Sequence, residues 1–251
     1  MQAAAFIIHL ERAVSRKPQV DWLKSNLPIA AEILPAVDGA KLTAAEKKSV
    51  YQRHIHRPHY PFALRDAEIG CFLSHRLAWQ KIVNYDLDFG FVIEDDINID
   101  LNTFQQAFEL VAKASAPGTY TRFPWRFGET GPVVAQGTSD CRVTLADRPG
   151  LGMLGQIVTR AAAEKLLAVT EFFDRPVDTT LQLTWITGVK LQSVWPNGLN
   201  EISDKLSGST IGDKKGLLEK VHREISRPIY RTKVELHRRL RFHRTPNNPI
   251  E

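Results

Sequence analysis

Apolar runs of strand length alternate with amphipathic segments of helix length along residues 1–200 of the chain. Continuous apolar runs are typical of strands buried on both faces, and the clearest cover residues 3–10 and 89–93. The predicted strands are residues 3–10, 29–37, 89–93, 132–135, 141–145, 153–159 and 190–196. The predicted helices are residues 15–27, 43–52, 66–84, 103–114, 160–169 and 177–187. Strands that alternate with helices predict an α/β domain with a mostly parallel central sheet flanked by helices.

Two of the predicted helices have recognisable N-terminal caps. Thr43 and Glu46 have the spacing of a capping box, which predicts a helix that begins just after Thr43. Asp100 or Asn102 can cap the helix that follows the strand at 89–93. Polar side chains between this strand and this helix are therefore expected at the carboxyl edge of the sheet, where α/β proteins bind ligands.

The composition is that of a soluble globular protein. The chain has 251 residues, 43% of them hydrophobic and 24% charged, which is sufficient for one sizeable core. No stretch approaches the roughly eighteen consecutive apolar residues of a membrane span. The first apolar run has no basic segment before it and meets Glu11 directly after it, so a strand is expected and not a signal peptide. Cys71 and Cys141 are too few for a disulfide framework and are expected to be reduced thiols of a cytoplasmic protein.

The positive charge is concentrated near the C-terminus. Residues 214–244 contain eleven Lys and Arg and three Glu, a net charge of +8, against +5 for the whole chain. Apolar residues share one helical face there, namely Leu217, Leu218, Val221 and Ile225. We therefore divide the chain into a domain at 1–213 and a basic amphipathic helical tail at 214–251, expected to lie on an anionic membrane surface. The alternatives are a helix that packs on the domain and a segment that binds nucleic acid.

Three carboxylates, Glu94, Asp95 and Asp96, follow the apolar strand 89–93 directly. Adjacent ionised groups near a core are costly unless a cation compensates them, and oxygen ligands suit Mg²⁺ or Mn²⁺. Alternation along a strand places Glu94 and Asp96 on one side and Asp95 on the other. The alternative is an exposed loop whose acids only cap the next helix.

Several motifs resemble those of glycosyltransferase family 25, the lipooligosaccharide-type sugar transferases. The most specific is EIGCFLSHRLAWQKIVNYDLDFGFVIEDD at residues 68–96. Four shorter segments are similar to other motifs of the family in the same order: FIIHLERAVSRK (6–17), LPAVDG (34–39), IVTRAAAEKLL (157–167) and RPVD (175–178). The chain departs from the family pattern at His9, Gln156, Thr159 and Ala162, where Asn, Tyr, Ser and Gly are usual.

The resemblance implies a GT-A fold and an enzyme that transfers a hexose, galactose or glucose, with inversion at the anomeric carbon. The implied donor is a UDP-sugar, the implied cofactor Mn²⁺ or Mg²⁺, and the acceptor a hydroxyl of a bacterial lipooligosaccharide or other surface glycan, which can be lipid-linked. With the basic tail, this favours a peripheral location on the cytoplasmic face of the inner membrane. No nucleic-acid partner is expected.

Carried over residue by residue, the resemblance makes Asp96 a metal ligand, with Glu94 assisting the ion or the donor ribose. The further donor-binding residues are Arg12, Asp38, Gly39 and His75. The alternatives are that Asp38 is a plain turn residue and that His75 is a buried structural histidine.

An inverting transfer also needs a carboxylate that takes the acceptor proton. Asp178 in the RPVD motif is the candidate, because it follows Pro176 and opens a predicted helix whose N-terminal end favours an ionised carboxylate. Its alternative role is a helix cap. Asp147 and Glu129 are the other candidates for the base.

Two other classes of protein remain open from the residues alone. A metal-dependent phosphohydrolase or nuclease also uses clustered acids, and a non-catalytic protein could bind membranes or nucleic acid through its basic tail. The histidines of HIHRPH (54–59) match no structural-zinc spacing. Cys71 and His75 are four residues apart, but on an apolar helix face a packing role is favoured over a thiolate nucleophile.

Overall fold

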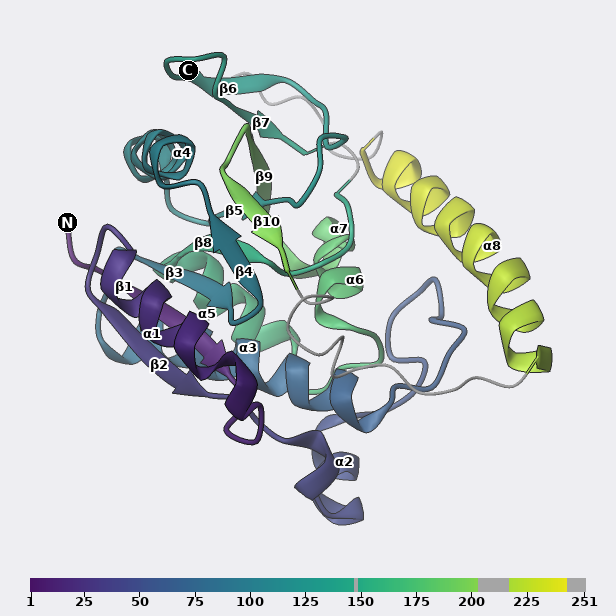
Figure 1. Ribbon diagram of the computed structural model, residues 1–251. Helices are drawn as coiled ribbons and strands as arrows, with labels where there is room; N and C mark the ends of the chain where they lie inside the picture. The colour runs from purple at the N-terminus through teal and green to yellow at the C-terminus, as the bar shows by residue number, and fades with distance from the viewer. Residues whose placement is uncertain (147–148, 203–216, 243–251) are drawn as a thin grey trace.

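The computed structural model describes residues 1–146, 149–202 and 217–242 (Figure 1), and for 217–223, 225, 241 and 242 it describes the backbone alone. Asp147, one candidate base, lies outside these residues, as do both ends of the predicted tail. Among the described residues, no helix is long and apolar enough to span a membrane.

An eight-stranded sheet in the order β2-β1-β3-β8-β5-β9-β7-β6 forms the centre of the fold (Figure 1). Its strands are β1 (Ala3–His9), β2 (Ala31–Pro35), β3 (Phe89–Glu94), β5 (Thr119–Phe123), β6 (Val133–Gln136), β7 (Arg142–Leu145), β8 (Gly155–Thr159) and β9 (Lys190–Trp195). Strands β7 and β8 run opposite to the other strands of this sheet. A separate antiparallel pair joins β4 (Ile97–Ile99) to β10 (Leu199–Glu201). The predicted fold class, α/β with a mostly parallel central sheet, is confirmed.

Helices cover both faces of the sheet. They are α1 (Lys17–Asn26), α2 (Ala44–Val50), α3 (Asp66–Asn84), α4 (Leu101–Ala114), α5 (Arg160–Val169), α6 (Val177–Leu181), α7 (Thr184–Thr187) and α8 (Leu217–Phe242), with short 3-10 turns η1 (Val14–Arg16) and η2 (Gly39–Lys41). Thr43 and Glu46 form the predicted capping box of α2, and Asp100 caps α4.

Alternate residues of the central strands pack against the two helical layers. Ile7 of β1 and Phe91 of β3 belong to a core cluster with residues of α1 and α4. Phe6 and Val92, one position along each strand, pack instead with residues of α3 and α5. Because both faces of β1 and β3 are buried, these strands contain continuous apolar runs, which is the pattern that predicted them.

The sequence pattern missed β4, β5 and β10 and joined α6 and α7 into one helix. Strand β5 has the sequence TYTRF, in which Arg122 is buried although it is charged. Its guanidinium is compensated by Glu129 and by the carbonyl oxygens of Gly150 and Gly152. Glu129 is seven residues from Arg122 and the two carbonyl oxygens are 28 and 30 residues away. No pattern within the strand itself therefore indicates that a buried arginine is compensated there.

Helix α8 continues through Pro228 as one helix and lies along one side of the domain (Figure 1). Tyr230 is buried, accepts a 2.7 Å hydrogen bond from Arg175 Nη1, and packs edge-on against Tyr60. His237 stacks on Trp185 of α7, with ring centroids 6.3 Å apart. Residues 217–242 of the predicted tail are helical, and the contacts of Tyr230 and His237 agree with the alternative that the helix packs on the domain. The expected membrane role concerns the opposite face.

Candidate active site

A cavity of about 240 Å³, here called the strand-end cavity, opens at the carboxyl ends of β1, β2 and β3. It is lined by all the residues predicted to bind donor or metal, namely Arg12, Asp38, Gly39, His75, Glu94 and Asp96. They come from three loops and from α3, so the fold brings together residues that the sequence places more than eighty positions apart. Their individual roles stay predictions.

Asp95 lines the strand-end cavity beside Glu94 and Asp96, and not the other side as alternation predicts, because β3 ends at Glu94. It differs from its two neighbours in that hydrogen bonds hold its carboxylate in place. It is buried, and its carboxylate accepts hydrogen bonds from Arg16 Nη1 at 2.6 Å and from His9 Nδ1 at 2.7 Å. Arg16 also lies 3.1 Å from Asp96 and is itself buried. His9 is the residue at which the chain departs from the family's usual Asn, and here it fixes the turn after β3.

Glu94 and Asp96 line the cavity together with Glu201, which β10 brings beside them by pairing with β4. Burial and repulsion by Asp96, Asp95, Asp178 and Glu201 raise the pKa of Glu94 well above its ordinary value. Burial raises the pKa of Asp96 in the same direction, although Arg16 opposes the shift.

This concentration of carboxylate oxygens fits a divalent cation. One buried guanidinium, that of Arg16, is shared between Asp95 and Asp96. The raised pKa values of Glu94 and Asp96 express burial first and then repulsion among the neighbouring acids. Hard oxygen ligands suit Mn²⁺ or Mg²⁺, and Glu94 and Asp96 at the end of β3 would hold the ion with Glu201 of β10. Among the described residues their ligand atoms do not gather within 4.8 Å of one another, as those of Cys71, His75 and Glu94 do. Glu201 was not predicted, because it lies over a hundred residues from the acidic motif in a strand of three residues.

His75 is buried on α3, and neither of its ring nitrogens has a hydrogen-bond partner. Its Nε2 lies 3.7 Å from Glu94 Oε1, too far for a hydrogen bond. Burial lowers the pKa of His75 to about 3, so the ring is neutral and can donate one hydrogen bond and accept another.

Cys71 lies beside His75, and ligand atoms of Cys71, His75 and Glu94 lie within 4.8 Å of one another. Burial and the nearby Glu94 raise the pKa of the Cys71 thiol well above its ordinary value. The thiol is therefore protonated at neutral pH, which agrees with the packing role expected for it and not with a thiolate nucleophile.

Arg12 and Asp38 face each other across the mouth of the cavity. Arg12 Nε donates to Asp38 Oδ2 at 2.8 Å, and the Arg12 side chain is 52% exposed. Burial alone would raise the pKa of Asp38, but the hydrogen bonds from Arg12 and from the Ala40 N–H outweigh it and hold the pKa below its ordinary value. Gly39 is required by packing, because a Cβ there would meet the Asp66 carbonyl oxygen.

Asp178 lies in a second cavity of about 390 Å³, the Asp178 cavity, which shares Cys71 and Glu94 with the strand-end cavity. Pro176 caps α6, so Asp178 is in the first turn and is not the cap residue. Its Oδ1 accepts from the Thr179 N–H at 2.6 Å and its Oδ2 from the Gly152 N–H at 2.9 Å.

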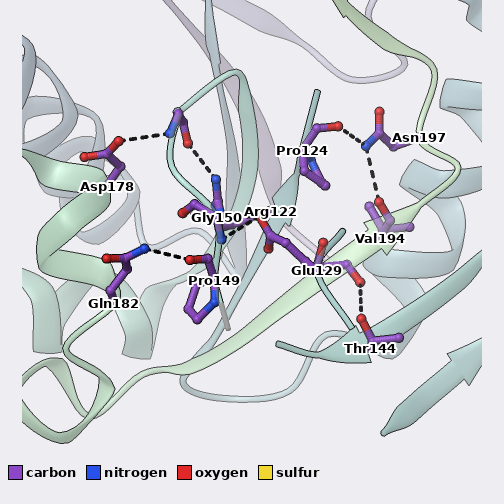
Figure 2. A network of polar contacts seen from close by, with 12 residues as sticks. Arg122, Pro124, Glu129, Thr144, Pro149, Gly150, Asp178, Gln182, Val194 and Asn197 are labelled. Carbon is purple, nitrogen blue, oxygen red and sulfur yellow. Dashed lines mark hydrogen bonds and ion pairs between the residues drawn. The ribbon is translucent and has the colours of Figure 1, made fainter. Parts of the chain in front are cut away.

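The Gly152 contact belongs to a network that holds the loop 149–152 from both sides (Figure 2). Asp178 of α6 and Gln182, which directly follows α6, bind Gly152 and Pro149 on one side. Arg122 and Glu129 bind the loop on the other side through Gly150. Asp178 therefore has a structural role beside its predicted catalytic one.

The other candidates for the base are less suitable. Glu129 is buried, pairs with Arg122, and accepts from the Gly150 N–H at 3.0 Å, so its charge is already compensated. Asp147 lies outside the described residues. Among the described residues, His54, His56 and His59 do not gather into a metal-binding cluster, and the backbone N–H of His56 binds Asp174.

A third cavity, of about 550 Å³, lies further along α8 and is called the Trp125 cavity. It shares Leu151, Gln182 and Arg231 with the Asp178 cavity. Of its lining residues, Glu129 is the one that the sequence offers as a candidate base.

Comparison with known proteins agrees with the motifs. Residues 2–126 match the model of glycosyltransferase family 25, described as an LPS biosynthesis protein. A glycosyltransferase 25 family member from Drosophila pseudoobscura pseudoobscura is 29% identical over 199 residues, covering 74% of this chain and 32% of the relative. Human procollagen galactosyltransferase 2 is 31% identical over 98 residues, covering 38% of this chain and 16% of the relative. The chain thus spans less than a third of the length of either relative.

Among solved structures, a mutant Drosophila β-1,4-galactosyltransferase 7 in complex with manganese, UDP-Gal and xylobiose is similar with a TM-score of 0.42 and 9% identity. That alignment covers 89% of this chain and 80% of the other. The family match includes the strand-end carboxylates, the SH motif of α3 and the Arg12 and Asp38 loops. The chain belongs to glycosyltransferase family 25.

Proposed function

We propose that the chain transfers a hexose from a UDP-sugar to a hydroxyl of a bacterial lipooligosaccharide or other surface glycan, with inversion and with the help of Mn²⁺ or Mg²⁺. The observation that carries the proposal is the strand-end cavity, where carboxylates of raised pKa, the Arg12–Asp38 pair and a neutral His75 line one space beside Asp178. Galactose is the hexose named in the human relative, which favours UDP-galactose as the first donor to test.

The strand-end cavity is assigned to the donor. Arg12 and Asp38 lie at its mouth, where a guanidinium and a carboxylate can bind the phosphate and the nucleoside hydroxyls or base. His75 has two unused ring nitrogens that can bind donor oxygens. A divalent ion on Glu94, Asp96 and Glu201, when bound, supplies positive charge that neutralises the leaving diphosphate.

The Asp178 cavity is assigned to the acceptor. The acceptor oxygen bonds to the anomeric carbon as the bond from that carbon to the phosphate oxygen breaks, and UDP leaves. The hydroxyl proton passes to Asp178, where Oδ2 accepts one hydrogen bond and retains a lone pair. The Gly152 N–H and the Thr179 N–H keep the carboxylate in place during this step.

A thermal-shift screen of nucleotide sugars with and without Mn²⁺, followed by a transfer assay, tests this function. We expect UDP-hexoses to raise the melting temperature more with Mn²⁺ than without it, and transfer to require an added acceptor. Hydrolysis of nucleotide sugars without transfer to any acceptor would indicate a phosphohydrolase instead. Absence of any Mn²⁺-dependent nucleotide effect would support a non-catalytic binding protein.

We also propose that the outer face of α8 binds an anionic bilayer and keeps the enzyme at the cytoplasmic face of the inner membrane. Ile229, Leu236 and Leu240 are 50%, 53% and 57% exposed and lie on one side of α8 at spacings of seven and four. The exposed Arg239 lies next to this stripe. Basic amphipathic helices of this kind bind anionic lipid surfaces.

Liposome co-sedimentation tests the membrane role. Replacing Ile229, Leu236 and Leu240 together by Ser, or removing residues 214–251, should reduce binding to vesicles that contain phosphatidylglycerol. Vesicles of phosphatidylcholine alone should bind the wild type weakly. Equal sedimentation of the wild type and both variants would contradict the proposal.

A further inference from the structure

The Asp178 cavity and the Trp125 cavity adjoin along the inner face of α8, and together they are called the α8 groove. They share Leu151, Gln182 and Arg231, and their volumes are about 390 and 550 Å³. One end of the groove is at Asp178 and Glu94, and the other is at Trp125 and Phe127. Each part has the size of an ordinary small-molecule site.

The far end of the groove presents aromatic rings to solvent. Trp125 is 45% exposed and Phe127 59% exposed. Exposed rings in a cavity offer the apolar surface on which the C–H face of a sugar ring can pack. The guanidinium of Arg126 lies 4.6 Å from the Trp125 ring centroid.

The wall formed by α8 contributes unpaired positive charge. Arg231 lines both cavities, and within the described part of the chain it has no ion pair or hydrogen bond. Arg227, one turn earlier on α8, lines the Asp178 cavity, and it too has no ion pair or hydrogen bond among the described residues. By contrast Arg238 is bound to Glu235 at 2.9 Å and Arg122 to Glu129. A free guanidinium in a cavity is suited to two-pronged binding of a phosphate or carboxylate.

The charges along the groove set an orientation for a bound anion. Asp178 contributes a carboxylate at its inner end, while Arg227 and Arg231 make the α8 side positive. A ligand with one anionic substituent is repelled from the first region and attracted to the second. Its neutral hydroxyl-bearing end is therefore the part that can reach Asp178.

We propose that the α8 groove selects acceptors that are saccharides bearing a phosphate or carboxylate group. Arg231, with Arg227, binds the anionic group, and Trp125 and Phe127 pack against a neighbouring sugar ring. The proposal rests on the assignment of this chain as a sugar transferase and extends it to the acceptor class. It also makes α8 a part of the substrate site instead of an appendage.

Binding of small probes tests this without requiring catalysis. Dissociation constants for glucose, glucose 6-phosphate and glucuronate are measured by ligand-observed NMR on the full chain with UDP and Mn²⁺ present. We expect both anionic probes to bind roughly ten-fold more tightly than glucose, the scale of one charge-assisted hydrogen-bonded contact. Arg231→Ala should remove this preference, and Trp125→Ala should weaken all three probes alike.

Lys233→Ala is the matched control, because it removes a positive charge from an exposed position of α8 that lines neither cavity. It should leave the preference intact. Equal binding of charged and neutral probes by the wild type, or equal loss in the Arg231 and Lys233 variants, would overturn the proposal. If Arg231→Ala lowered binding to phosphatidylglycerol vesicles and left glucose 6-phosphate binding unchanged, the anion site would belong to a lipid headgroup and the proposal would fail.

The same variants separate this inference from the transferase assignment. If the anionic probes bind through Arg231 but no UDP-hexose supports transfer, the groove stands and the proposed function fails. If UDP-hexose transfer occurs and Arg231→Ala does not change kcat/KM for a phosphorylated relative to a neutral acceptor, the function stands and the groove proposal fails.

Discussion

The strand-end cavity and the α8 groove have different side chains and are suited to different ligands. In the strand-end cavity carboxylates outnumber the cations near them, and Asp95 is fixed by His9 and Arg16 while Glu94 and Asp96 face the open space. In the α8 groove the α8 side carries the guanidinium groups of Arg227 and Arg231, and the exposed rings of Trp125 and Phe127 lie at one end. The first region requires a cation before it can hold a diphosphate. The second can hold an anion directly.

The two regions also differ in how the chain builds them. The strand-end cavity uses loops that follow consecutive parallel strands, so its residues appear as short motifs directly after apolar runs. The groove is assembled from segments near residues 60, 125, 150, 178 and 231, which share no local pattern. A family can therefore keep the first region recognisable while the second varies with the acceptor.

The largest effect should come from the carboxylate that faces the donor. Asp96→Ala is expected to abolish transfer and Mn²⁺-dependent UDP binding, because the ion would lose a ligand and the diphosphate its neutralising charge. Turnover and UDP titrations with and without Mn²⁺ measure both losses. Full wild-type activity in excess chelator would contradict the metal-assisted mechanism.

Asp95→Asn is the matched comparison within the same motif. It weakens the pairing of buried Arg16, so the free energy of unfolding should fall by about 1 to 3 kcal/mol. Mn²⁺-dependent UDP binding should be reduced less than in Asp96→Ala. Equal losses of binding in the two variants would show that the carboxylates do not divide into a structural and a ligand-facing member.

The second largest effect should come from the residue where the two regions meet. Asp178→Asn is expected to lower turnover by roughly 10²–10⁴-fold with little change in UDP-sugar affinity, because the acceptor proton loses its base. Because Asp178 also holds the loop 149–152, Gln182→Ala is the control: it removes another hydrogen bond to the same loop but no carboxylate. A comparable rate loss in both variants, or a collapse of donor affinity in Asp178→Asn, would make Asp178 a structural residue.

The sequence predicted the fold class, the buried strands β1 and β3 and the residues of the strand-end cavity because their signals are local. Apolar runs reveal strands that are covered on both faces, and polar residues directly after parallel strands meet at one edge of the sheet. Glu94, Asp96 and Asp38 were found in this way, with the family resemblance to assign roles to them.

The residues that escaped prediction depend on distant partners. Glu201 lies in the strand-end cavity because β10 pairs with β4. Arg16 matters to the site because it donates a hydrogen bond to the buried Asp95. Strand β5 escaped because Arg122 near its end is buried, and the Gly150 and Gly152 carbonyl oxygens that bind it lie 28 and 30 residues away. The basic tail was interpreted from its charge and its apolar face, but Tyr230 and Arg231 act through contacts with segments far away in the chain.

The pH dependence of cation binding separates the two regions further. The pKa of Glu94 is raised, so Glu94 is ionised only above that raised value and becomes protonated as the pH falls through it. A proton then competes with the ion, and the apparent Mn²⁺ dissociation constant should rise up to about ten-fold per pH unit below this value. Calorimetric Mn²⁺ titrations between about pH 8 and pH 5 measure the slope. Glu94→Gln should bind Mn²⁺ weakly with a shallower slope, and a flat wild-type profile would remove Glu94 from the ion site.

The smallest expected effect concerns the attachment of α8 to the domain. Tyr230 stays a neutral hydroxyl because burial raises its pKa to about 12, and it accepts a hydrogen bond from the fully buried Arg175. Tyr230→Phe leaves Arg175 Nη1 without that partner, so the free energy of unfolding should fall by about 1 to 2 kcal/mol.

In the Tyr230→Phe variant α8 should be held less firmly against the domain. Because the acceptor would then have to order α8 on binding, acceptor KM should rise a few-fold while donor KM stays unchanged. Tyr85→Phe is the control, since it removes a hydroxyl from a side chain that is 49% exposed and lines none of the three cavities. Denaturant titrations and steady-state kinetics with both substrates varied measure these changes. If donor KM rises as much as acceptor KM, α8 supports both regions, and the division between donor cavity and acceptor groove is wrong. If neither KM changes while the free energy of unfolding falls, α8 is a structural helix and no part of the acceptor site.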